Sequence, residues 1–62
     1  MSRAERKLKS EILIQVYAEL FRRRLMADIG YDIRSEIDRE KDARKRGAML
    51  AAERIVYGEM RK

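Results

Sequence analysis

The chain has 62 residues, which allows one domain at most, residues 1–62, and limits how much surface it can bury alone. Cysteine and histidine are absent, which excludes disulfides, thiolate or imidazole metal sites and nucleophile–histidine dyads. The net charge is +5, from 16 basic and 11 acidic residues, and this favours nucleic acid or an acidic protein surface as the partner. Oligomerisation is the remaining way for so short a chain to enlarge its core.

A long first helix is expected over residues 3–28. Ser2 and Glu5 have the spacing of a capping box, in which the serine hydroxyl accepts a helical N–H and the glutamate reaches back. Gly30 is placed to adopt the left-handed conformation that often ends helices. Residues 29–32 then form a short turn, and a connection of this length predicts two antiparallel helices.

The second helix is expected over residues 33–61, with Asp32 as its N-cap. Its apolar residues recur at the spacing of one helical face, but the run 38–46 contains a single apolar residue, Ala43. Gly47 follows this charged run and marks a candidate break, because glycine weakens a helix interior. The expected fold is therefore all-α, an antiparallel helical hairpin with a third helix if the chain breaks near Gly47.

Residues 12–21 are almost all apolar, which gives a stripe too wide for a single neighbouring helix. In a simple hairpin the charged run 38–46 would face residues 15–23, and burying unpaired charges there would cost more than the apolar contact gains. Two arrangements avoid this conflict. Either the segment packs on a second copy, or the chain bends at Gly47 and its C-terminal helix folds onto the first. The first is favoured because a dimer also enlarges the core, and the two can coexist.

The expected oligomer interface is this apolar segment together with an arginine at its border. It consists of Ile12, Leu13, Val16, Tyr17, Leu20, Phe21 and Arg24. The apolar pattern does not continue as regular heptads, so it favours a short helical bundle over a long coiled coil. We expect a homo-oligomer, and a dimer in particular.

Three basic groups are candidate nucleic-acid contacts, because neutralised phosphates give salt-dependent and largely sequence-independent affinity. Acidic residues lie within reach of the second and third groups, Glu19 for Arg23 and Asp42 for Arg46, so a solvated charged surface is the competing interpretation. The first group has the fewest acids around it. The groups are Arg3, Arg6, Lys7 and Lys9; Arg22 and Arg23; and Arg44, Lys45 and Arg46.

The leading hypothesis is a small regulator, such as a DNA-binding regulator of transcription, that binds nucleic acid electrostatically as a homodimer. The alternative is a protein-binding module (an inhibitor, an antitoxin-like protein or an assembly factor) whose apolar helix face docks on a larger partner. No acidic cluster has metal-loop spacing and no glycine-rich loop is present. We therefore expect no enzyme activity, metal, cofactor or small-molecule substrate.

The apolar run is far shorter than the roughly 20 residues that a membrane-spanning helix needs. It also lacks the small-residue cleavage site of a signal peptide. Without cysteine, a reducing compartment is the default, so a cytoplasmic location and no membrane partner are expected.

Overall fold

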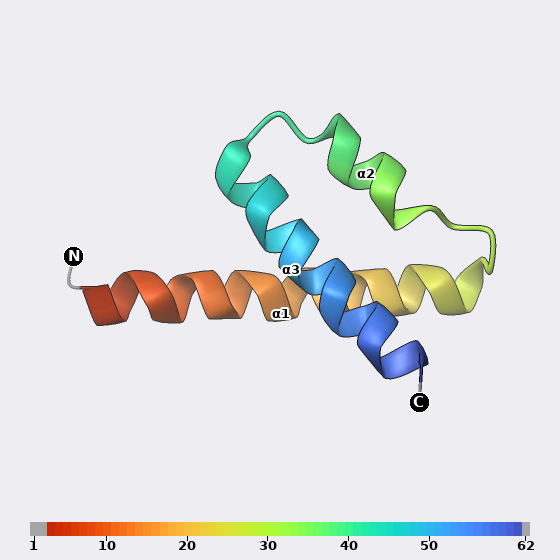
Figure 1. The fold of residues 1–62 in the computed structure, drawn as a ribbon, viewed down its shortest axis with the longest axis horizontal. Helices are drawn as coiled ribbons and strands as arrows, with labels where there is room; N and C mark the ends of the chain where they lie inside the picture. The colour runs from red at the N-terminus through yellow and green to blue at the C-terminus, as the bar shows by residue number, and fades with distance from the viewer. Residues whose placement is uncertain (1–2, 62) are drawn as a thin grey trace.

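The computed structural model describes residues 3–61, and this part of the chain folds into three helices without a strand (Figure 1). Helix α1 spans Arg3–Ala27, α2 spans Ile33–Arg39 and α3 spans Ala43–Met60. The all-α prediction is confirmed. The capping box expected from Ser2 and Glu5 rests on side chains outside the described part.

The end of α1 is formed by an aspartate rather than by glycine geometry. The backbone N–H of Asp28 donates to the carbonyl of Arg24 at 2.9 Å, and the Asp28 carboxylate accepts from the N–H of Gly30, also at 2.9 Å. Gly30 has no positive φ, so the expected left-handed termination is wrong. A short polar side chain that accepts from the backbone two residues on turns the chain equally well.

Helix α2 begins with the N-cap that the sequence predicts. The Asp32 carboxylate accepts from the N–H of Arg34 at 3.0 Å and from the Ser35 hydroxyl at 2.9 Å. These donors stabilise the ionised form, and the hydroxyl of Ser35 makes the largest contribution to a lowered pKa of Asp32. The cap fixes the start of a helix only seven residues long.

The chain is interrupted at residues 40–42, and not at Gly47. Glu40 closes α2 with its backbone N–H, and Asp42 caps α3 by accepting from the N–H of Arg44 at 2.9 Å. Gly47 lies inside α3, with nothing within 4 Å of the position that a Cβ would occupy. The expected break near Gly47 is therefore wrong: a helical glycine costs only about 1 kcal/mol, and the aspartate cap starts the helix before it.

Helix α3 does not return antiparallel along α1. It crosses α1 obliquely and runs in the same general sense, while α2 brings the chain back (Figure 1). Accordingly, Arg22 near the end of α1 pairs with Glu59 near the end of α3. The hairpin register that would set residues 38–46 against 15–23 is not formed. The C-terminal helix instead folds onto α1, which is the second of the two expected arrangements with its bend at residues 40–42.

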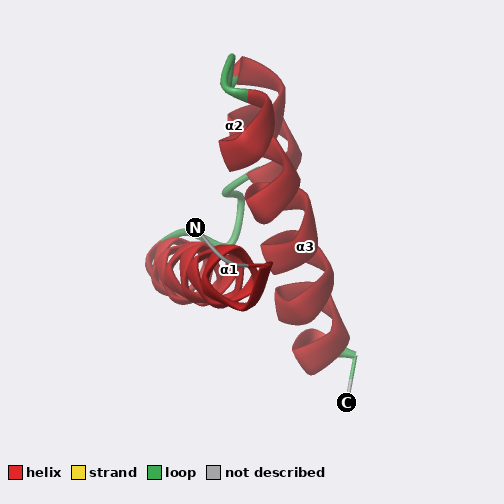
Figure 2. Cartoon of the chain, turned by 90° about the vertical axis from the view of Figure 1, so that its left-hand side faces the viewer, coloured by secondary structure: helices red, strands yellow, loops and turns green. Residues whose placement is uncertain are grey.

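The core lies where α3 packs against both α1 and α2. Ala18 and Ala52 are fully buried within it, and small side chains at a crossing let two helices approach closely. Viewed from the side, α3 covers only one side of α1 (Figure 2). The buried cluster consists of Ala18, Phe21, Ile33, Ile37, Met49, Ala52 and Val56.

Candidate functional site

A groove forms where the N-terminal half of α1 meets the first turns of α3. We call it the basic groove because Arg6, Lys9 and Arg44 lie along it and are all exposed. The structure thus brings together members of the first and third predicted basic groups. The groove is lined by Arg6, Lys9, Ser10, Leu13 and Ile14 of α1 and by Ala43, Arg44, Gly47 and Ala48 of α3.

The cap of α3 decides which of its basic residues reach the groove. Because Asp42 starts the helix, Arg44 stands in the first turn, where it lines the groove together with residues of α1. Arg46 has another role: its Nε donates to the carbonyl oxygen of Glu40 at 3.0 Å, and Nη2 contacts the same oxygen. Arg46 therefore satisfies a carbonyl at the end of α2. Lys7 and Lys45 are exposed outside the groove lining, and the side chain of Arg3 is outside the described part.

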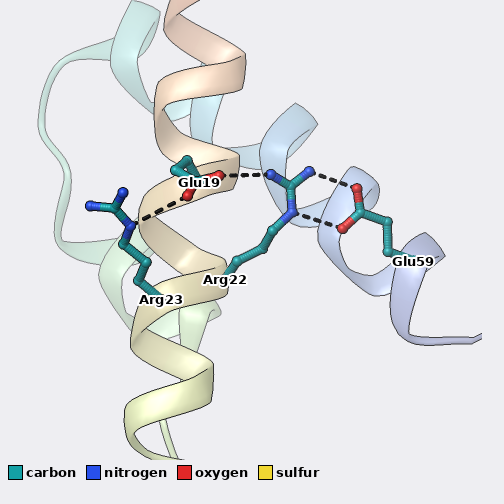
Figure 3. Close-up of polar contacts among 4 residues, drawn as sticks. All are labelled: Glu19, Arg22, Arg23 and Glu59. Atoms are coloured by element: carbon teal, nitrogen blue, oxygen red, sulfur yellow. Dashed lines mark hydrogen bonds and ion pairs between the residues drawn. The ribbon is translucent and has the colours of Figure 1, made fainter.

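Both arginines of the second basic group form ion pairs, and one of these pairs joins α1 to α3 (Figure 3). Nε and Nη2 of Arg22 bind the two carboxylate oxygens of Glu59 at 2.7 and 2.6 Å, and Nη1 binds Glu19 at 3.2 Å. Arg23 contacts Glu19 at 3.3 Å, as the sequence predicts. The hydrogen bond to Glu59 is the largest of the contacts that raise the pKa of Arg22. Arg22 therefore links the two helices, and the charges of both arginines are partly neutralised.

Arg24 joins α1 to the segment that follows it. Its Nη1 donates to the Tyr31 hydroxyl at 2.9 Å, and its guanidinium lies 5.5 Å from the centre of the same ring. It also pairs with Glu36 at 3.5 Å. The hydrogen bond to Tyr31 is the main cause of the raised pKa of Arg24. Arg24 thus contacts residues of its own chain at the position predicted to border an oligomer interface.

The predicted interface residues divide between two sides of α1. Phe21 is 1% exposed and belongs to the chain's own core. Tyr17 is half-buried, with its ring stacked on Phe21 at 6.1 Å between centroids, and Leu13 is also half-buried. The remaining three, Ile12, Val16 and Leu20, are exposed.

Leu8 extends this exposed set to four large apolar side chains, between 36% and 58% exposed, which we call the apolar ridge: Leu8, Ile12, Val16 and Leu20. Its members are four residues apart, so they follow one another along the same side of the helix. Sequence reasoning missed Leu8 because it lies outside the continuous apolar run, although the i, i+4 spacing was visible. A shallow groove beside the ridge also includes Glu11, Gln15, Glu19, Arg23, Ile14 and Ile55.

A partly buried ion pair also escaped the sequence analysis. Nη2 of Arg34 on α2 donates to Oε1 of Glu53 on α3 at 2.8 Å, and Glu53 is buried. Spacing gives no signal for this pair, because its partners lie on different helices. It fixes α2 against α3 and so helps to position the first turns of α3 at the basic groove.

No protein-family model, curated protein or solved structure matches this chain significantly. Within residues 3–61, no helix is both long and apolar enough to cross a membrane. The basic groove and the apolar ridge are the surface features from which a function can be inferred.

Proposed function

We propose that this protein binds nucleic acid electrostatically through the basic groove, as a homodimer. The observation that supports the proposal is that Arg6, Lys9 and Arg44 line one groove from two helices. Arginine binds phosphate oxygens in a bidentate manner, and the net charge of +5 favours the approach of a polyanion.

The chemistry of the groove favours backbone contacts over base recognition. None of the residues that line it is aromatic, so base stacking does not contribute there. Contacts to phosphate position a protein on nucleic acid but carry no direct sequence information. The expected binding is therefore salt-sensitive and tolerant of sequence, with log K falling by about 0.9 per neutralised duplex phosphate for each unit of log salt.

The test compares two double variants that lose the same charge. Arg6→Gln with Arg44→Gln removes two cations from the basic groove, whereas Arg39→Gln with Arg54→Gln removes two exposed cations outside it. In a fluorescence titration with duplex and single-stranded oligonucleotides, the first variant should bind more weakly and lose about 2 units of salt slope on the duplex for each copy whose groove contacts it. The Arg39 and Arg54 double variant should change the affinity and the salt slope much less.

Two results would contradict the proposal. One is a wild-type chain that fails to bind either oligonucleotide at low salt. The other is an equal loss in both double variants, because this would show that net charge matters and the groove does not.

The exposed ridge also favours a second candidate function, a protein-binding module that docks Leu8, Ile12 and Val16 on a larger partner. This candidate predicts a chain that stays monomeric alone and that binds no nucleic acid. The solution mass of the protein, measured after nucleic acid is removed, separates the two candidates.

A further inference from the structure

The single chain exposes more surface than its mass predicts. Its accessible surface is 5177 Å², whereas a compact monomer of 7.4 kDa exposes roughly 4,200 Å². Its radius of gyration is 12.3 Å, against roughly 11 Å for a compact chain of this length. The excess, roughly 1,000 Å², is comparable to the area of about 800 Å² that each partner buries in a standard interface.

The apolar ridge is the part of this surface that a second copy fits best. It lies on the side of α1 away from the buried Ala18 and Phe21, which are covered by α3. A row of side chains four residues apart forms a continuous ridge along the helix, and such ridges pack into the grooves of a facing helix. A second copy supplies an identical row, as two-fold interfaces require.

Charge selects the orientation of the two helices. A parallel pair would bring Arg6, Lys7 and Lys9 of both copies side by side, and like charges repel within a Debye length of about 8 Å. An antiparallel pair centred between Ile12 and Val16 separates these clusters by roughly 18 Å along the axis. It also sets Glu19 at the level of Lys9 of the partner subunit, which brings opposite charges closer.

We propose that the apolar ridge is covered by the apolar ridge of a second copy of this chain, with the two α1 helices antiparallel. Leu8 then lies at the level of Leu20 of the partner subunit, and Ile12 at the level of Val16 of the partner subunit. Each α3 stays on the outside of the α1 pair.

This arrangement has a consequence that rests on the proposed nucleic-acid function. The two-fold axis of an antiparallel helix pair is perpendicular to both helices, so a feature on one flank of α1 recurs on the same side of the dimer. The basic groove opens on one flank of the ridge, where Arg6 and Arg44 lie. The two grooves therefore open on the same side, and one duplex contacts both.

Sedimentation equilibrium on the nucleic-acid-free full chain tests whether a second copy covers the ridge. The expected mass is twice the 7.4 kDa of one chain. Val16→Glu should give a monomer that keeps its helical circular dichroism, because Val16 is exposed in the single chain. Ile29→Glu also replaces an exposed β-branched residue with glutamate, but in the turn and away from the ridge. This control variant should remain dimeric. A monomeric wild type at tens of micromolar, or a dimeric Val16→Glu, overturns the proposal.

Disulfide trapping tests the orientation, because the chain has no cysteine of its own. Leu8→Cys and Leu20→Cys are mixed in equal amounts and oxidised. An antiparallel pair should give the mixed 8–20 disulfide at least about tenfold more often than the 8–8 product, since a disulfide needs Cα atoms within about 7 Å. Excess 8–8 product overturns the antiparallel arrangement.

The trapped mixed dimer also tests the placement of the two grooves. Its duplex binding should show about twice the salt slope of the Val16→Glu monomer; equal slopes overturn the same-side placement. Mass and trapping are measured without nucleic acid, so they fail or succeed independently of the proposed function. Loss of binding in the Arg6 and Arg44 double variant should leave the mass unchanged.

Discussion

The two sides of α1 differ in what covers them. On one side Ala18 and Phe21 are buried under α3, and on the other Ile12 and Val16 are exposed. Both sides belong to the same apolar segment, residues 12–21. A stripe too wide for one neighbouring helix is thus divided: one side builds the chain's own core, and the other stays exposed in the single chain, where we propose that a second copy packs.

The difference also separates stability from assembly. Burying a large apolar side chain contributes about 1.5–3 kcal/mol, and Phe21 obtains this within one chain. The apolar ridge gains little of this burial free energy in the single chain, because its side chains are exposed. Since a domain of 62 residues has a free energy of unfolding of roughly 3–9 kcal/mol, changes to the covered side should unfold the chain. Changes to the ridge should mainly dissociate the proposed dimer.

The largest expected effect follows from Phe21→Ala. Removing this ring leaves a cavity under α3 and should lower the free energy of unfolding by about 3–5 kcal/mol, most of the total. A urea titration followed by circular dichroism measures the loss. A variant as stable as wild type would show that α3 does not cover this side of α1 in solution.

A smaller effect is expected where α2 holds α3 in place. Arg34→Ala leaves the Glu53 carboxylate, which is only 9% exposed, without its cation. Because Arg34 itself is 59% exposed, solvent screens the pair, and the expected loss in unfolding free energy is about 1–2 kcal/mol. Arg39→Ala, on the exposed side of the same helix, should change it by less than about 0.5 kcal/mol. Equal losses would refute a specific role for the ion pair.

The stability that the Asp32 cap gives to the start of α2 should depend on pH. The Ser35 hydroxyl lowers the pKa of Asp32 below its ordinary 3.8, so ionised Asp32 stabilises the fold at pH values above that figure. This contribution is lost as the pH falls through the lowered, folded-state pKa. The difference in melting temperature between wild type and Asp32→Asn should therefore shrink in acid. A difference that is constant from neutral pH to about pH 2 would contradict the lowered pKa.

The smallest effect on the single chain is expected from Ile12→Ser on the apolar ridge. At concentrations where the chain is monomeric, the free energy of unfolding should change by no more than about 0.5 kcal/mol, because Ile12 is already exposed. The dimer dissociation constant should rise by at least about tenfold, since the change occurs twice in the interface. A large loss of monomer stability would show that the two sides of α1 are not independent.

Local signals predicted the helical fold but misplaced its second bend. The run 3–28 and the Asp32 cap were readable because caps and apolar spacing act over a few residues. Asp42 was interpreted as an ion-pair partner of Arg46, whereas it caps α3 and Arg46 binds the carbonyl of Glu40. Both roles of Asp42 are compatible with the sequence. The helix-breaking tendency of Gly47 is weak, but it favoured a break after residue 46 over a cap at Asp42.

The candidate site was less predictable because it depends on how helices cross. The crossing of α1 by α3 places Arg6 and Arg44 along one groove and sets Arg22 against Glu59. Sequence spacing separates the basic groups only by the acids close to them in the chain, since nothing local shows which cation will meet a distant carboxylate. Pairs within one helix are open to such reasoning, and the Glu19–Arg23 pair was predicted in this way.

The shared direction of α1 and α3 also polarises the molecule electrically. Each helix carries a partial positive charge at its N-terminus and a partial negative charge at its C-terminus, and parallel helices add these dipoles where antiparallel ones cancel them. The N-terminal half of α1 and the first turns of α3 line the basic groove together, with Arg6 and Arg44 among its residues. An anion that approaches this end therefore meets the backbone field and the arginine charges acting together.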